Sequence, residues 1–101
     1  MDLGIFTTHA STRLPLSEIV ASLHKLKNDG HLGGDQLIFL EGEASALALK
    51  HSDKTISCED IRMWMHELEH KYDDHGIDSA KVENHIAPAL AEVLNKHISH
   101  S

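Results

Sequence analysis

The chain has 101 residues, a formal net charge of −7 with histidine neutral, 25% charged residues and 41% hydrophobic residues. This length and composition are those of one globular domain, so we expect residues 1–101 to fold as a single unit. The acidic balance argues against nucleic acids and anionic membrane surfaces as partners, because acidic side chains are repelled by phosphate groups. It favours instead a protein partner with a basic surface.

The sequence also points to a cytoplasmic protein without a membrane span. It has no apolar run of the length that crosses a bilayer, and its N-terminus lacks the basic region of a secretory signal. The single cysteine, Cys58, excludes an intramolecular disulfide framework, and we interpret it as structural or incidental.

Residues 1–13 predict a short irregular or strand-like arm, in which Leu3, Ile5 and Phe6 form a short strand or pack on the core. A helix is expected to follow, because Pro15 suits a first helical turn and apolar residues then recur with helical spacing. Asn28, Asp29 and Gly30 end that pattern, and the glycine-rich residues 30–34 predict a connecting loop.

Residues 36–51 allow two interpretations. The apolar run at 37–40 and the internal Gly42 are compatible with a small hairpin, which would make the fold α+β. The alanines at positions 44, 46 and 48 raise helix propensity, so we favour a helix.

The segment from Ser57 to Gly76 carries the clearest helix signals. Ser57 suits an N-cap, Asp60 stands three residues later, and Gly76 suits a stop. The apolar positions fall on one helical face, namely Ile61, Trp64, Met65, Leu68 and Tyr72.

The last predicted helix begins after Asp78, which suits its N-cap, and runs into the C-terminal tail. Pro88 lies in its middle, where it is expected to kink or restart the helix. Four amphipathic segments with short connections therefore predict an all-α fold, a compact bundle of about four helices with a short N-terminal arm.

One spacing in the helix at 57–76 points to chemistry. His66-Glu67-x-x-His70 places two imidazoles one turn apart on the face away from the predicted core, where they are able to bind zinc or nickel. Glu67 would be the base of a hydrolase variant. The candidate metal ligands are His66, His70, Asp73, Asp74 and His75.

A calcium loop around Gly76 is not expected. When Gly76 is placed at the sixth position of a calcium-binding loop, Lys71 takes the first position and Val82 takes the twelfth. Both positions require acidic ligands.

No catalytic set stands out, so the sequence favours a non-enzymatic binding module such as a regulator, adaptor, chaperone or inhibitor. Its expected contact surface is the acidic, histidine-rich helix face made of Glu59, His66, Glu69, His70 and Asp73. Three alternatives stay open. The His66/His70 pair suggests a metal-binding protein, the ten histidines suggest a pH-responsive helper, and the few aromatic residues leave room for a homodimer that completes the core.

Overall fold

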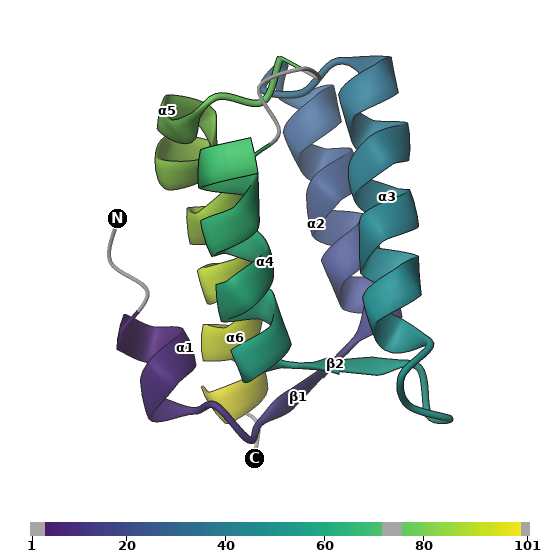
Figure 1. The fold of residues 1–101 in the computed structure, drawn as a ribbon, viewed down its shortest axis with the longest axis vertical. Coiled ribbons are helices and arrows are strands. Elements are labelled where there is room, and N and C mark those ends of the chain that lie inside the picture. Colours follow the sequence, from purple (N-terminus) through teal and green to yellow (C-terminus); the bar gives the residue numbers. More distant parts are fainter. Residues whose placement is uncertain (1–3, 72–75, 100–101) are drawn as a thin grey trace.

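Two helix–strand–helix units meet at a small sheet in the computed structural model, which describes residues 4–71 and 76–99 (Figure 1). The first unit consists of α1 (Gly4–Thr8), β1 (Arg13–Pro15) and α2 (Leu16–Asn28). The second consists of α3 (Gly34–Ala48), β2 (Thr55–Ser57) and α4 (Cys58–Lys71). A C-terminal segment follows, made of α5 (Ser79–Lys81), the π-helical turn η2 (Val82–Ile86) and α6 (Ala87–Ser99).

The two strands join the units through one buried pair. They run antiparallel, and Leu14 lies opposite Ile56 with both side chains fully buried. Arg13 at the edge donates from Nε to Thr55 Oγ1 over 2.8 Å and pairs with Asp53 Oδ1 over 2.8 Å. The sheet therefore fixes the register of one unit against the other.

The C-terminal segment fills the space between the units. α2 packs on α3 and α1 packs on α4, while η2 and α6 contact α2, and η2 also contacts α4. In Figure 1, α6 passes behind α4 on the side away from α3. Ile86, Leu90 and Leu94 are fully buried there, so the molecule's own C-terminal helix covers this inner apolar face.

The prediction of a helical bundle is confirmed, and the alternative hairpin at 36–51 is wrong. α3 is one continuous helix, because its buried positions follow helical spacing: Leu37, Leu40, Ala44 and Ala48. Ile38 and Gly42, which suggested a strand, both lie on the exposed side of this helix.

The predicted caps are confirmed at two helices. The Ser57 hydroxyl accepts a hydrogen bond from the Asp60 amide, and the Asp78 carboxylate accepts one from the Lys81 amide. Pro15 differs from expectation: it ends β1 in an extended conformation, and α2 begins one residue later. In the N-terminal arm, Phe6 packs on the core as expected, but residues 4–8 form a helix and the strand begins only at Arg13.

Pro88 is accommodated by a π-helical turn. The Ala87 amide donates to the Val82 carbonyl, five residues back, and Pro88 follows as the second residue of α6. Because proline has no amide hydrogen, its usual helical bond is missing, and a wider turn beside it absorbs the change. The predicted kink or restart thus takes the form of this turn.

The turn between α3 and β2 contains a residue in the left-handed conformation. Lys54 has a φ of 55°, a backbone conformation that side chains other than glycine rarely adopt. Its carbonyl accepts a hydrogen bond from the Leu16 amide, so this turn is tied to the first turn of α2.

Candidate functional site

The outer face of α4 carries the candidate residues that the sequence analysis singled out. Met63, His66 and His70 are exposed, and Glu59 and Glu69 are half-buried beside them. Met63 exposes 48% of its surface and is one of three exposed large apolar side chains among the described residues, with Ile38 and Leu49. The remaining candidates Asp73, Asp74 and His75, and the core candidate Tyr72, lie outside the described residues.

His66 and His70 lie close together, as their spacing predicts. Their ring centroids are 4.6 Å apart and their planes cross at 60°. Crossing planes allow in-plane nitrogen lone pairs to converge on one ion. Within residues 4–71 and 76–99, no group of three or more histidine, cysteine or acidic side chains is arranged to hold a metal. Binding by this pair with ligands outside those residues stays a prediction.

Glu59 on the same face is held by an ion pair with Arg62. The Arg62 guanidinium donates to both carboxylate oxygens, at 2.6 and 3.2 Å. These hydrogen bonds, together with the positive charge, lower the pKa of Glu59, and the Glu59 carboxylate raises the pKa of Arg62. This acid therefore stays charged, but its charge is partly neutralised within the helix.

A groove of about 230 Å³ runs between α3 and α4 beside this face. The two helices stand opposite one another in Figure 1, linked at one end through β2. The groove is lined from α3 by Glu43, Ala46 and Leu47, from the turn after α3 by Lys50, and from α4 by Asp60, Met63, Trp64 and Glu67. Lys50 Nζ lies 3.5 Å from Asp60 Oδ1, so these two charges offset each other. The two remaining acids, Glu43 and Glu67, give the lining a net negative charge.

Two of the side chains that line this groove each have a buried polar atom without a hydrogen-bond partner among the described residues. They are the indole nitrogen Nε1 of Trp64 and the carboxylate oxygen Oε1 of Glu43. Glu41 Oε1 is also buried, but it contacts His24 Nε2 across α2 and α3. Buried polar groups are nearly always hydrogen-bonded, so these two atoms are exceptions to the rule.

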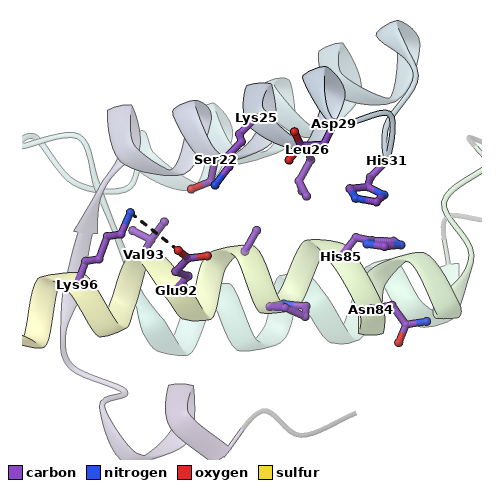
Figure 2. A pocket seen from close by; sticks show the side chains of 12 residues that line it. Ser22, Lys25, Leu26, Asp29, His31, Asn84, His85, Glu92, Val93 and Lys96 are labelled. Atoms are coloured by element: carbon purple, nitrogen blue, oxygen red, sulfur yellow. Dashed lines mark ion pairs between the residues drawn. The ribbon is translucent and has the colours of Figure 1, made fainter.

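A second cleft, of about 250 Å³, lies between α2 and the η2–α6 segment (Figure 2). At one end His31 and His85 stack, with ring centroids 3.9 Å apart and an angle of 16° between the planes. Nearly parallel rings direct their in-plane lone pairs side by side, so the two imidazoles do not converge on one ion. The sequence analysis did not bring these two histidines together, because they are 54 positions apart in the chain.

The charges around this second cleft are balanced. Figure 2 shows Lys25 and Asp29 on α2 or directly after it, and Glu92 and Lys96 on α6, where the last two form an ion pair at 4.0 Å. Two acids and two bases give the cleft no net preference for an ion of either sign.

Asp53, the acid in the turn before β2, is already engaged within the protein. Its carboxylate accepts hydrogen bonds from the Arg13 guanidinium and from the Thr55 hydroxyl, each at 2.8 Å.

The chain matches no protein-family model, no curated protein and no solved structure. Across the described parts of the chain, no helix combines the length and apolar character needed to cross a membrane.

The sequence analysis missed the groove, although it placed Trp64 correctly. It assigned Trp64 to the apolar face of its helix, and the side chain is buried. One signal in the sequence was the indole N–H of Trp64. A buried indole N–H normally has a hydrogen-bond acceptor, which the sequence alone does not identify.

Proposed function

We propose that this chain is a small protein-binding module that docks a basic segment of a partner on the outer side of α4. The observation that carries the proposal is the exposed Met63 set between acidic side chains on a helix face that no described element covers. Binding surfaces often combine an apolar anchor with a polar rim. The face consists of Glu59, Met63, His66, Glu69 and His70, and Asp73 is expected to extend it.

The position of α6 supports the outer side over the inner one. An amphipathic helix bound in an apolar groove is a common recognition mode, and here the inner groove already holds η2 and α6. A partner would have to displace the buried Ile86, Leu90 and Leu94 to use it. The outer side of α4 requires no such displacement. A cytoplasmic location goes with this proposal.

The test is a binding assay on the intact protein with fluorescent peptides of equal length and graded net charge. Affinity is expected only for cationic peptides with an apolar residue, and it should fall as salt rises from about 50 to 300 mM, because the Debye length shortens. Met63→Ser and Glu69→Gln should weaken binding, whereas Glu92→Gln on α6 should not. Affinity that ignores peptide charge, salt and the α4 variants would refute the proposal.

A metal-binding function is the second candidate, supported by the crossing planes of the His66 and His70 rings. It takes zinc or nickel as the ion. A homodimer is the third arrangement to test, since Ile38 and Leu49 are both largely exposed at α3 and its end. Native mass spectrometry of untagged protein, with and without zinc, measures both metal stoichiometry and oligomeric state.

A further inference from the structure

The outward side of α3 carries large apolar side chains that no described element of the chain covers. Ile38 exposes 70% of its surface, and Leu49, directly after the helix, exposes 83%. They are two of the three large apolar side chains that are exposed in the described part of the chain. In Figure 1, α3 forms one edge of the molecule, and α2 and α4 both lie to the same side of it.

Helical spacing aligns these two residues with two small ones. Leu49 still has a helical backbone conformation, so at 100° per residue the positions 38, 42, 45 and 49 fall within about 60° of one another. All four are exposed, and together they form the α3 stripe: Ile38, Gly42, Ser45 and Leu49. The stripe has no charged side chain. Since the chain has a net charge of −7, two copies meet least repulsion where they approach through an uncharged face.

Gly42, in the middle of the stripe, is not required by the surroundings that the structure describes. An added Cβ would meet no atom within 4 Å, and the described glycines with a positive φ are Gly30 and Gly76. Glycine inside a helix is less favourable than alanine. Its advantage is the missing side chain, because another backbone is then able to approach closely. The position of Gly42 thus favours a second helix packed across the stripe.

The stripe is complementary to itself when two copies of α3 run antiparallel. Positions 38 and 49 are equally far from the centre of the stripe, and so are positions 42 and 45. A two-fold axis through that centre therefore brings Ile38 of one copy to Leu49 of the other, and Gly42 to Ser45. Each contact then occurs twice in the pair.

A hollow at one end of the stripe suits the isoleucine that arrives there. Ser45 and Leu49 line this hollow together with Leu16 and Ala48, and its volume is about 410 Å³. In the antiparallel alignment, Ile38 of the other copy reaches this end of the stripe. Each copy therefore offers one apolar side chain and one place that receives it.

The charges at the two ends of α3 agree with the antiparallel alignment. Asp35 stands in the first turn of the helix, and Lys50 follows its last turn. Antiparallel packing brings the acid of one copy toward the base of the other, whereas parallel packing would place like charges side by side.

We propose that the α3 stripe is the interface of a homodimer, in which two copies of α3 pack antiparallel and Ile38 of each copy enters the hollow beside Leu49 of the other. The stripe is short, about 17 Å at 1.5 Å per residue, so it buries less than the roughly 800 Å² per partner of a standard interface. A weak dimer is expected, with a dissociation constant between about 10 μM and 1 mM. This inference gives the homodimer a specific interface and does not depend on the binding function of α4.

The test is sedimentation equilibrium of the untagged, intact protein across that concentration range. Association should hold or strengthen as salt rises, because screening reduces the repulsion between two acidic copies. Ile38→Glu and Leu49→Glu should each raise the dissociation constant by about tenfold or more, since each contact occurs twice. Gly42→Gln should also weaken the dimer, although glutamine favours the helix. Met63→Glu adds the same charge at the third exposed apolar residue and should leave association unchanged.

A paired replacement tests the alignment itself. Ile38→Glu combined with Leu49→Lys brings opposite charges together at both contacts of an antiparallel dimer. The double variant should therefore associate more strongly than Ile38→Glu alone or Leu49→Lys alone. In a parallel dimer like charges would meet instead. Circular dichroism of each variant shows that it is folded, as expected for replacements at exposed positions.

A protein that stays monomeric throughout that range, or a dimer that Ile38→Glu and Leu49→Glu leave unchanged, would overturn the interface. A double variant no stronger than its single variants would overturn the antiparallel alignment. The binding function of α4 is judged separately. Ile38→Glu should still bind the cationic peptides, whereas Met63→Ser should bind them more weakly and still dimerise.

Discussion

Replacing Glu43 by methionine is expected to stabilise the protein. A buried polar atom without a partner costs about 1–3 kcal/mol, and Glu43→Met removes such an atom while keeping a side chain of similar length. Glutamate and methionine have similar helix propensities, so α3 itself should be little affected. Because Glu43 is only half-buried overall, we take the lower end, about 1 kcal/mol. For a domain of this size that gain raises the melting temperature by about 4–8 °C.

The assay is thermal unfolding followed by circular dichroism near neutral pH, and two variants isolate the cause. Glu43→Gln removes the same charge but leaves a polar amide in the groove, so its melting temperature should rise much less. Glu92→Met makes the same replacement at an exposed position and should change stability by at most about 0.5 kcal/mol. A melting temperature for Glu43→Met at or below that of the unmodified protein refutes the reasoning. An equal rise in Glu43→Gln would assign the effect to charge instead.

Three further outcomes are expected. Burial raises the pKa of the Cys58 thiol to about 11, so alkylation near pH 8 should proceed only as fast as the protein unfolds, and rapid labelling of folded protein would contradict this. The Thr55 hydroxyl and a nearby guanidinium lower the pKa of Asp53. The contribution of the Asp53 carboxylate to stability is therefore present above about pH 3.9 and is lost as the pH falls further. In Asp53→Asn the melting temperature should depend less on pH in that acidic range than in the unmodified protein. Zinc uptake measured by native mass spectrometry should disappear when His66 and His70 are both replaced by alanine, and unchanged stoichiometry would remove the metal hypothesis.

The long helices were predictable because their signals are local and repeated. α2, α3 and α4 each bury residues at helical spacing, and the Ser57 and Asp78 caps mark two boundaries. The strands were not predictable, because each has only three residues. An alternation of apolar and polar residues over three positions cannot be distinguished from chance. Their pairing depends on Leu14 meeting Ile56 from a distant part of the chain.

The candidate site was predictable only on one helix. The exposed positions of His66, His70 and Met63 follow from the phase of α4, which its apolar face determines. The groove is lined by Glu43 from α3 and Trp64 from α4, and no local pattern shows which residues of two separate helices line the same groove. The conformation of Lys54 was likewise hidden, because glycine is the residue that normally signals a positive φ.

Arg13 connects the two units at the edge of the sheet. Its guanidinium reaches from β1 to Asp53 and Thr55, which precede and begin β2. An exposed ion pair contributes little stability, and the Arg13 and Asp53 side chains are both exposed. The register of the strands therefore depends mainly on Leu14 and Ile56, which face each other and are fully buried, because a slip by one residue would move both apolar side chains out of the core.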